Sequence, residues 1–326
     1  MVTGAAGFIG RAIVARLAAR GDEVVALVRD PARAAHLKKE GVALVSSDLS
    51  SVADLTAQMS GANSVIHAAG MYEVGIKASQ RDRMWQANVR ATERVLDAAI
   101  AAGVARIVYL STVGIFGDTR GEIVDESYQR DLNHGFLSHY DETKYRAHEA
   151  ALARMAAGAP IVIVQPSQVY GPNDHSLASG QLEQAYNGRL RYTALTNNGL
   201  GWVHVDDLAD GIVAALDSGR IGESYVLAGE PHRLNEAIAL AARLGGAKAP
   251  RLAVPTGVLK VVAPISDRIG GLPGLPPNLR ETIRSADGVT YWAKHDKATA
   301  ELGFSPRSLE RGIVDTWAAA ERRDSG

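Results

Sequence analysis

The sequence predicts an α/β protein with a doubly wound parallel sheet and a smaller, mostly helical C-terminal lobe. Three observations carry this prediction. Three glycines, Gly4, Gly7 and Gly10, are spaced G-x-x-G-x-x-G directly before a helical pattern. Strand and helix patterns then alternate to about residue 165, which is typical of a parallel sheet with right-handed crossovers. After residue 165 the pattern changes to loops and helices separated by prolines.

The glycine-rich loop has the spacing of a phosphate-binding turn. One glycine allows the tight turn from strand to helix, a second lets a pyrophosphate approach the backbone, and a third lets the helix pack on the strand. The helix that follows, with Phe8 and Ile9 at its start, offers free N–H groups and the positive end of its dipole. The spacing alone also fits a plain turn, but the apolar run 23–29 supplies the second strand of a βαβ unit. The loop therefore predicts a Rossmann-type dinucleotide site.

The first expected strand is short. Only Met1, Val2 and Thr3 precede Gly4, fewer than the usual strand of about five residues, so we expect that the start codon is misassigned or that a few residues are missing. Apolar runs bounded by turn residues predict further strands at 42–46, 64–67, 106–110 and 160–164. Periodic patterns predict helices at 51–59, 82–102 and 138–157.

The pattern after residue 165 predicts how the chain divides. A strand at 202–205 leads into a helix that ends at Leu216, and another strand lies at 224–227. The remaining segments predict helices at 234–244, 256–269, 278–285, 296–302 and 308–322. We therefore expect a dinucleotide-binding domain at 1–165, completed by about 201–228, and a substrate-binding lobe at 166–200 and 229–326.

Composition and charge argue against several classes of function. The net charge of -1 gives no bulk electrostatic case for binding nucleic acid or an anionic membrane. The absence of cysteine excludes disulfides and thiolate catalysis, and the nine histidines show no metal-ligand spacing, so we expect no metal. No apolar run is long enough to span a membrane and no signal peptide is recognisable, so we expect a soluble cytoplasmic protein.

Tyr140 and Lys144 form the candidate catalytic pair. They lie four residues apart in a predicted helix and so share one of its faces. An ammonium group there would lower the pKa of the phenol from about 10, so that Tyr140 could act as acid or base near neutral pH. Ser111 and Thr112 follow the strand at 106–110, where a hydroxyl could hydrogen-bond a substrate oxygen. A Tyr–Lys pair on its own is more often a surface pair, so its catalytic role depends on the other motifs in the sequence.

Five motifs in order carry a family resemblance: Thr3–Gly10, Ser111–Gly117, Tyr140–Lys144, Pro166–Pro172 and Val203–Asp207. Together they resemble an extended, or atypical, short-chain dehydrogenase/reductase of the NAD-dependent epimerase/dehydratase superfamily. The match spans about the first 230 residues, and the C-terminal lobe is far less diagnostic. The segments V-R-D-P and P-S-Q-V-Y-G-P are most similar to dihydroflavonol reductase-like and hopanoid-associated epimerase-like members.

The resemblance implies roles for individual residues. Tyr140 would be the general acid or base, and Lys144 would tune it and hold the nicotinamide ribose. Thr112 would hold the substrate oxygen, or Ser111 if the register is off by one. Asn88 matches a structural or proton-relay asparagine, although a helix-surface amide is an equal alternative. The other positions that match cofactor contacts are Asp48 and Leu49 at the adenine, His67, Ala68 and Ala69 in the turn beside the cofactor, and Pro166 and Gln168.

The end of the second strand bears on the choice between NADP and NAD. An acidic residue there would bind the ribose 2′-hydroxyl, whereas an arginine would accommodate a 2′-phosphate. This chain has Val28 followed by Arg29, and Asp30 comes one position late, before Pro31. We therefore expect NADP, with Arg29 at its 2′-phosphate, and NAD is the alternative.

Departures from the family pattern narrow the expected substrate. Val113 and Gly114 follow Thr112, where sugar-nucleotide 4,6-dehydratases carry Asp-Glu, and Gln168 stands where the epimerases usually carry Asn. The leading prediction is an NADP-dependent carbonyl reductase or alcohol dehydrogenase that acts on a small or apolar aldehyde or ketone. The alternatives are a sugar-nucleotide epimerase with tightly held NAD and a non-catalytic dinucleotide sensor.

Two weaker expectations complete the prediction. Trp202, Tyr72, Met71 and Phe116 lie near strand ends and favour an apolar substrate, although aromatic residues in such places are often core. The helices at 82–102 and 138–157 pack as a four-helix bundle between two subunits in proteins that this chain resembles. A homodimer is therefore a further expectation.

Overall fold

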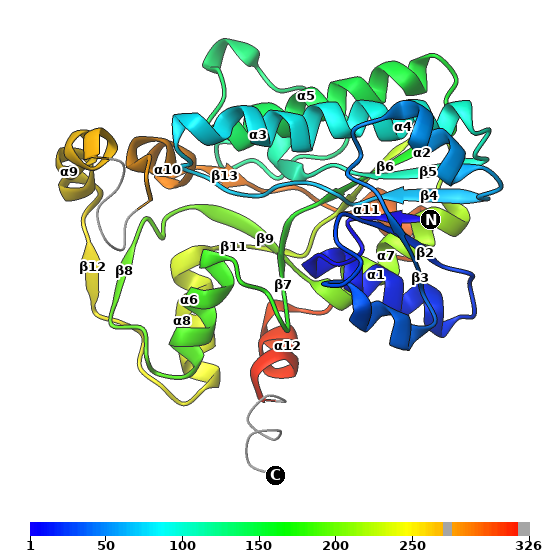
Figure 1. Cartoon of the computed structure of the whole chain (residues 1–326). Coiled ribbons are helices and arrows are strands. Elements are labelled where there is room, and N and C mark those ends of the chain that lie inside the picture. The colour runs from blue at the N-terminus through cyan, green and yellow to red at the C-terminus, as the bar shows by residue number, and fades with distance from the viewer. Residues whose placement is uncertain (270–275, 319–326) are drawn as a thin grey trace.

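A parallel sheet of seven strands forms the centre of the larger part of the molecule in this computed structural model (Figure 1). The structure describes residues 1–269 and 276–318. The strands lie in the order β10 (Ser224–Leu227), β6 (Ile161–Pro166), β5 (Arg106–Leu110), β4 (Ser64–His67), β1 (Val2–Thr3), β2 (Val25–Val28) and β3 (Ala43–Ser46). The predicted Rossmann-type, doubly wound sheet is confirmed.

The short strand β1 lies in the middle of the sheet. Val2 pairs with Ala26 of β2 on one side and with Ile66 of β4 on the other. The amino group of Met1 donates a hydrogen bond to the carbonyl of Ser64 at 2.7 Å. The chain moves from β1 outward to β3 and then returns to β4 next to β1. In open α/β sheets a ligand binds in the crevice at such a reversal, outside the carboxyl ends of the strands.

Helices cover both faces of the sheet, and each face has its own apolar core. One core joins the sheet to α1 (Phe8–Ala19), α7 (Val205–Ser218) and α11 (Asp296–Leu302). The other joins it to α2 (Val52–Met59), α4 (Ala91–Ala101) and α5 (His139–Ala156). The buried strands have apolar residues facing both cores, as a sheet covered on both faces requires.

The long helix predicted at 82–102 is interrupted. It consists of α3 (Arg81–Trp85), a π-helical turn (Gln86–Arg90) and α4. Asn88 lies in the π-helical turn, and its side chain is buried. Such turns commonly occur at functional sites, because the extra residue redirects side chains that a regular helix would send elsewhere.

The smaller part of the molecule is built around β9 (Gly199–His204). This strand pairs with β11 (Glu230–Arg233), β13 (Thr290–Tyr291) and β7 (Gln168–Tyr170), while β12 (Leu252–Val254) pairs separately with β8 (Tyr192–Ala194). Its helices are α6 (Leu177–Tyr186), α8 (Leu234–Leu244), α9 (Thr256–Ile269), α10 (Leu279–Ala286) and α12 (Leu309–Ile313), followed by a π-helical turn (Val314–Ala318). The predicted helix at 308–322 extends beyond the described residues from 319 onward. The short strands β8, β11, β12 and β13 were not expected, because two to four residues carry too little alternation to detect.

Short 3-10 helices connect the longer elements. They are η1 (Ala35–Glu40), η2 (Ala78–Gln80), η4 (Val113–Phe116) and η5 (Leu132–His134). Within residues 1–269 and 276–318, every helix is too short or too polar to cross a bilayer.

Candidate active site

The glycine-rich loop packs against the turn after β4 too closely for side chains at two of its glycines. Gly4 has a φ of 71°, and a Cβ there would lie 2.6 Å from the backbone nitrogen of Ala69 and 2.7 Å from the carbonyl oxygen of Ala68. A Cβ on Gly10 would lie 2.1 Å from the carbonyl oxygen of Gly4. Backbone atoms therefore form the wall of this cradle, which is what close approach of a pyrophosphate requires.

The start of α1 completes the cradle as an anion-binding site. Gly7 is the N-cap and has no side chain to accept the first N–H groups of the helix, which belong to Phe8 and Ile9. The first turn of α1 contains no acidic residue that would oppose the positive end of the helix dipole. Arg11 adds a guanidinium group whose Nε donates to the carbonyl of Ala6 at 3.0 Å. The loop thus fits the diphosphate of a dinucleotide.

Thr112, and not Ser111, lies beside Tyr140. The N–H of Gly114 donates to Thr112 Oγ1 at 3.1 Å, and the same hydroxyl lies near enough to the phenol of Tyr140 to lower its pKa. Ser111 Oγ lies 2.9 Å from His148 Nδ1 of α5, where both side chains are buried. The structure therefore brings the second of the two candidate hydroxyls into line with the phenol.

Tyr140 lies in the first turn of α5. Burial raises its pKa, the neighbouring Tyr72 and Tyr109 raise it further, and the nearby hydroxyl of Thr112 lowers it. This direction differs from the expectation that Lys144 lowers the pKa of Tyr140. The reason is that burial dominates and that the ammonium group of Lys144 donates to the carbonyl of Leu110 at 2.9 Å. Tyr140 therefore keeps its proton at neutral pH.

Lys144 is held inside the larger part of the molecule. Its ammonium nitrogen lies 5.3 Å from the centre of the Tyr109 ring, and its side chain runs along the face of α5 that packs on the sheet. Burial lowers the pKa of Lys144 to about 8. The ammonium group consequently stays charged at neutral pH but gives up its proton more easily than an exposed lysine.

Tyr72 contacts the ring of Tyr140 edge-on. The two ring centres are 4.8 Å apart with an interplanar angle of 88°, and Tyr72 is 62% exposed. Asn88 fixes the loop that carries Tyr72, since its side chain accepts from the N–H of Met71 at 2.6 Å and donates to the carbonyl of Met71 at 2.9 Å. The same amide donates to Thr143 of α5 at 3.0 Å. These bonds support the structural alternative for Asn88.

The other aromatic residues expected near a substrate are core residues. Trp202 is fully buried in β9 and packs against Tyr170 at 6.0 Å between ring centres, and Phe116 is also buried. Of the aromatic side chains named from the sequence, Tyr72 alone is exposed beside Tyr140. The apolar-substrate argument therefore rests on Tyr72 and on the half-buried Met71 before it.

His67 is engaged within the core. Its Nδ1 lies 2.7 Å from the hydroxyl of Thr3, and its Nε2 lies 3.0 Å from the hydroxyl of Thr92. Burial, together with the charge of Lys144, lowers the pKa of His67 to about 3, so the ring is neutral. The ring therefore ties β4 to β1 and α4, while backbone atoms of Ala68 and Ala69 lie against Gly4 of the glycine-rich loop.

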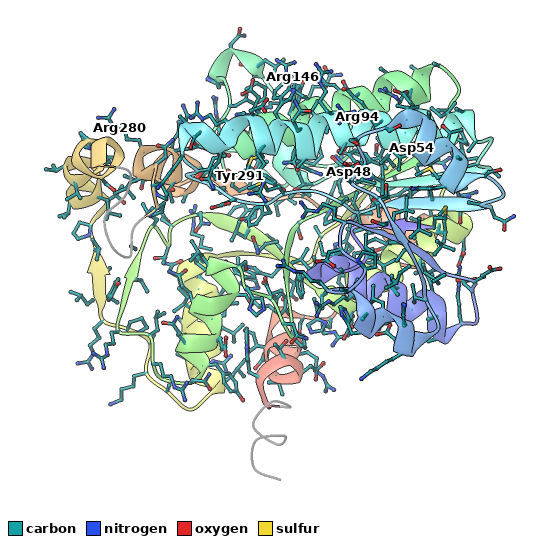
Figure 2. All side chains as sticks on the ribbon, viewed as in Figure 1. Asp48, Asp54, Arg94, Arg146, Arg280 and Tyr291 are labelled. Carbon is teal, nitrogen blue, oxygen red and sulfur yellow. The ribbon has the colours of Figure 1, made fainter. Side chains whose placement is uncertain are left out.

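The residues expected to contact the adenosine part of the cofactor lie just after the ends of β2 and β3. Arg29 is exposed, while the carboxylate of Asp30 accepts the N–H groups of Ala32 at 3.0 Å and Arg33 at 3.3 Å. Asp30 thus caps the following turn. Asp48, near Arg94 in Figure 2, is also exposed, and hydrogen bonds from Ser50 lower its pKa, with a smaller effect from the charge of Arg94. Leu49 follows it and is half-buried against the core between the sheet and α2.

A buried hydroxyl that sequence reasoning missed lies between Pro166 and Gln168. Ser167 Oγ is buried and has no hydrogen-bond partner among the residues that the structure describes. Gly201 permits its position, because a Cβ there would lie 3.3 Å from that oxygen. The side chain of Gln168 donates to the neighbouring carbonyl of Val169 at 3.1 Å. The free hydroxyl marks Ser167 as a candidate ligand contact where β6 leaves the large sheet.

Sequence reasoning also missed the contacts that α10 makes with the start of α5. Glu281 of α10 is buried, and its carboxylate accepts the N–H of His139 at 2.8 Å and the side-chain amide of Asn278 at 2.7 Å. Arg284 of the same helix donates to the carbonyl of Leu137 at 2.8 Å. The smaller lobe is therefore bonded to the residue that precedes Tyr140.

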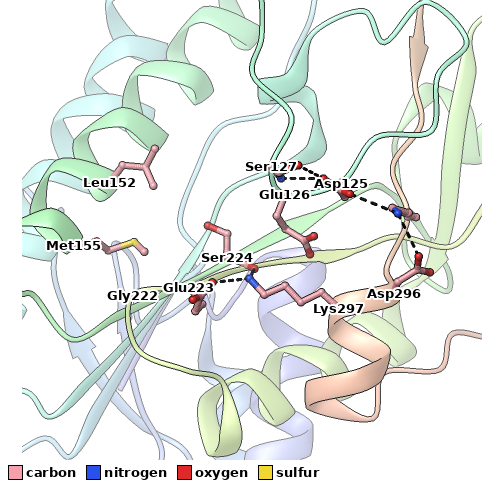
Figure 3. Close-up of a pocket in the computed structure, with 11 residues that line it drawn as sticks. Asp125, Glu126, Ser127, Leu152, Met155, Gly222, Glu223, Ser224, Asp296 and Lys297 are labelled. Carbon is pink, nitrogen blue, oxygen red and sulfur yellow. Dashed lines mark hydrogen bonds and ion pairs between the residues drawn. The ribbon is translucent and has the colours of Figure 1, made fainter.

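A separate hollow lies outside the edge strand β10 (Figure 3). It has a volume of about 520 Å³, and none of Tyr140, Lys144 and Thr112 lines it. The backbone of the edge strand is satisfied here by charged side chains: Val226 N–H donates to Glu126 at 2.7 Å, and Lys297 donates to the Ser224 carbonyl at 2.8 Å. Capping of this kind prevents another strand from pairing with the edge.

The order of the large sheet and the phosphate-binding loop after β1 define the class of Rossmann-type dinucleotide-binding proteins. Residues 1–228 match the sequence model of the NAD dependent epimerase/dehydratase family. The chain belongs to this family and is an NAD(P)-dependent enzyme of the extended short-chain dehydrogenase/reductase type. The resemblance predicted from the five motifs is confirmed.

Known relatives include reductases of similar length. A Synechocystis protein named "Putative dihydroflavonol 4-reductase" is 32% identical over 96% of this chain and 92% of its own length. A Stigmatella aurantiaca protein, 4-hydroxy-2-methyl-3-oxo-4-farnesyl-3,4-dihydroquinoline-1-oxide ketoreductase, is 29% identical over 96% of this chain and 94% of its own length. The crystal structure of gox2253 superimposes with a TM-score of 0.82 and 30% identity, covering 99% of this chain and 97% of that one.

Proposed function

We propose that this protein is an NADP-dependent carbonyl reductase that reduces a small or apolar aldehyde or ketone. The observation that carries the proposal is the position of the Thr112 hydroxyl, which accepts the N–H of Gly114, beside the phenol of Tyr140. A tyrosine that keeps its proton at neutral pH suits the donor role of reduction. The Stigmatella ketoreductase, whose name describes a farnesylated ketone, supports an apolar substrate.

The residues divide the reaction between them. NADPH, when bound, supplies hydride to the carbonyl carbon. Tyr140 donates its phenolic proton to the carbonyl oxygen, which becomes the hydroxyl of the product alcohol, and the tyrosinate regains a proton from solvent. Thr112 holds the same oxygen. Lys144, which is charged at neutral pH, stabilises the tyrosinate and holds the nicotinamide ribose.

The cofactor contacts follow from the cradle and the strand ends. The N–H groups of Phe8, Ile9 and Gly10 bind the diphosphate, and Arg29 binds the 2′-phosphate. The remaining contacts assigned to NADP are the adenine side at Asp48 and Leu49, the backbone of His67, Ala68 and Ala69, and the nicotinamide side at Pro166 and Gln168. Asn88 acts through Met71 rather than by touching the cofactor.

The division of labour between the two parts of the molecule belongs to the same proposal. Residues 1–165, with about 201–228, bind the dinucleotide, and 166–200 with 229–326 bind the carbonyl compound. Two copies associate through α4 and α5, which lie side by side along one face of the molecule (Figure 1). The enzyme acts in the cytoplasm.

A pair of tyrosine variants tests the proposal. Tyr140→Phe removes the proton donor without removing the ring, so NADPH-dependent reduction of ketones should fall at least about a hundredfold. Its dissociation constant for NADPH, measured by fluorescence titration, should stay within about twofold. Tyr145→Phe, on the same helix, is the matched control and should keep its activity. Undiminished turnover by Tyr140→Phe would disprove the mechanism, and co-purified NAD without NADPH turnover would favour the epimerase.

A further inference from the structure

Two segments of the smaller lobe, 186–195 and 245–262, contain lysine and arginine but no aspartate or glutamate. Their five cationic residues are Arg189, Arg191, Lys248, Arg251 and Lys260. The whole chain has 35 Lys and Arg against 36 Asp and Glu, so the rest of the molecule is net acidic. The chain-wide balance therefore hides a local excess of positive charge.

The fold brings these two segments side by side. Strands β8 and β12 are parallel, with Tyr192 opposite Leu252. A Cβ on Gly188 would lie 3.3 Å from the Cβ of Ala247, so the two segments are already in contact before the strands begin. Arg191 and Arg251 occupy the positions directly before the paired residues, and Arg189 and Lys248 precede them. Four cationic residues thus lie along two neighbouring segments of the chain.

Among residues 1–269 and 276–318, no carboxylate lies at ion-pair distance from these four side chains. All four are exposed. Among the described parts of the chain, Lys260 is the one cation of the five with a carboxylate at ion-pair distance, Asp287 at 2.8 Å. Like charges held together on a surface without a counter-charge favour binding of an anionic partner.

Exposed apolar side chains accompany the cations. Tyr192 is 58% and Leu252 is 64% exposed, and Val258 and Val261, three residues apart on α9, are 53% and 75% exposed. Strand alternation directs Arg191 and Arg251 away from the Tyr192 and Leu252 side of the two-stranded sheet, but long arginine stems let the charged groups reach round its edge. Figure 1 shows β8, β12 and α9 at the end of the molecule farthest from β3.

The positive surface continues into a hollow between α9 and α10. This hollow has a volume of about 330 Å³, and the described residues that line it include Lys260 and Arg284, with Asp287 as the ion-pair partner of Lys260. Arg280 lies at this end of the molecule in Figure 2. A lipid headgroup with net negative charge fits such a site better than a zwitterionic or cationic headgroup does.

We infer that the surface formed by β8, β12 and α9 docks on an anionic lipid bilayer. Apolar side chains enter the boundary between headgroups and acyl chains, while the flanking cations bind lipid phosphates. A nucleic acid would use the cations but would leave Leu252, Val258 and Val261 exposed, so a bilayer accounts for more of the surface. Docking in this way brings the smaller lobe, rather than the glycine-rich loop, to the membrane.

Co-sedimentation of the full chain with vesicles tests the inference. We expect binding to vesicles of phosphatidylcholine mixed with phosphatidylglycerol, a steep loss of binding as salt increases, and little binding to phosphatidylcholine alone. Equal binding to both vesicle types, or no binding at low salt, would overturn the inference. Tighter binding to duplex DNA or RNA in the same buffer would also overturn it.

Charge-reversal variants locate the surface. Each cation near an anionic bilayer changes binding roughly fivefold, so Arg191→Glu/Arg251→Glu should weaken vesicle binding at least 25-fold or so. Lys38→Glu/Lys39→Glu makes the same charge change on η1 and should stay within about twofold. Leu252→Ser/Val261→Ser should weaken binding without changing its salt dependence. If the first variant does not fold, Arg191→Gln/Arg251→Gln replaces it, and equal losses in the η1 control would contradict the assignment.

Discussion

The two parts of the molecule position their functional groups by different means. In the larger part, Gly4 and Gly10 meet neighbouring backbone atoms at distances that leave no room for a Cβ, so strand and helix positions set the site directly. In the smaller part, α10 reaches the catalytic helix through the side chains of Glu281 and Arg284. The cofactor cradle should therefore tolerate no substitution, whereas the link between the lobes should tolerate conservative ones.

The largest expected effect comes from Gly10→Ala. Its Cβ would lie 2.1 Å from the carbonyl oxygen of Gly4, so the loop must move away from the phosphates. NADPH binding, measured by fluorescence titration, should weaken at least about a hundredfold, and the free energy of unfolding should fall by about 3 kcal/mol. Gly180→Ala in α6, where a Cβ meets nothing within 4 Å, is the control and should be neutral or slightly stabilising. Normal NADPH binding by Gly10→Ala would contradict the cradle.

Glu281 tests the other side of the comparison. Glu281→Ala leaves the N–H of His139 and the amide of Asn278 without their buried partner, which should lower the free energy of unfolding by about 2 kcal/mol. Because His139 precedes Tyr140, we also expect kcat to fall about tenfold with little change in NADPH binding. The measurements are urea denaturation and steady-state kinetics on the same preparations.

Two further variants serve as controls for Glu281, one conservative and one at an exposed ion pair. Glu281→Gln keeps an oxygen for His139 and should restore most of kcat, whereas Glu310→Ala, which breaks an exposed ion pair with Arg243, should change stability by less than about 0.5 kcal/mol. If the glutamine variant is as impaired as the alanine variant, then the negative charge, and not the hydrogen bond to His139, is what matters.

The same contrast explains what could be predicted from sequence. The strands Ser64–His67 and Arg106–Leu110 lie where the apolar runs placed them, because a buried parallel strand is a local pattern. Tyr140 and Lys144 were recognisable because helical spacing puts them on one face. The contact between Glu281 and His139 joins residues 142 positions apart, and no local pattern encodes it.

Two details of the site also depended on three-dimensional packing. The choice between Ser111 and Thr112 is a matter of which hydroxyl faces α5, and the contact of Ser111 with His148 decides it in the structure. The pKa of Tyr140 is raised because burial outweighs other influences, and burial cannot be read from an i, i+4 spacing. Both details arise where sheet, helix and loop meet.

Lys144 extends the comparison, because it is a buried charged side chain in the larger part of the molecule, where backbone packing otherwise positions the site. Its pKa is lowered to about 8, so between this value and its unfolded pKa of about 10.5 the unfolded chain binds more protons than the folded one. Stability should therefore rise with pH in this window. From pH 8 to 9.5 we expect the contribution of Lys144 to grow by about 1.5 kcal/mol. Urea denaturation of wild type and Lys144→Met measures it as the difference between them.

The result for Lys144 has a matched control. Lys39→Met removes an exposed lysine, so its difference from wild type should not change over the same pH range. A difference for Lys144→Met that is flat between pH 8 and 9.5 would mean that Lys144 is solvated and that its bond to the carbonyl of Leu110 does not persist in solution.

Arg29 is the exception in the larger part, because a side chain rather than the backbone would select the nucleotide there. It is exposed at the end of β2, and the carboxylate of Asp30, which could otherwise hold a ribose 2′-hydroxyl, accepts two N–H groups of the next turn instead. Arg29→Ala should therefore weaken NADP binding about tenfold and leave NAD binding unchanged, since one charged hydrogen bond to phosphate is lost. Arg33→Ala, a nearby exposed arginine, should affect both nucleotides little. An equal loss for NADP and NAD would show that Arg29 contributes only general positive potential, and nucleotide choice would then fall to the backbone as well.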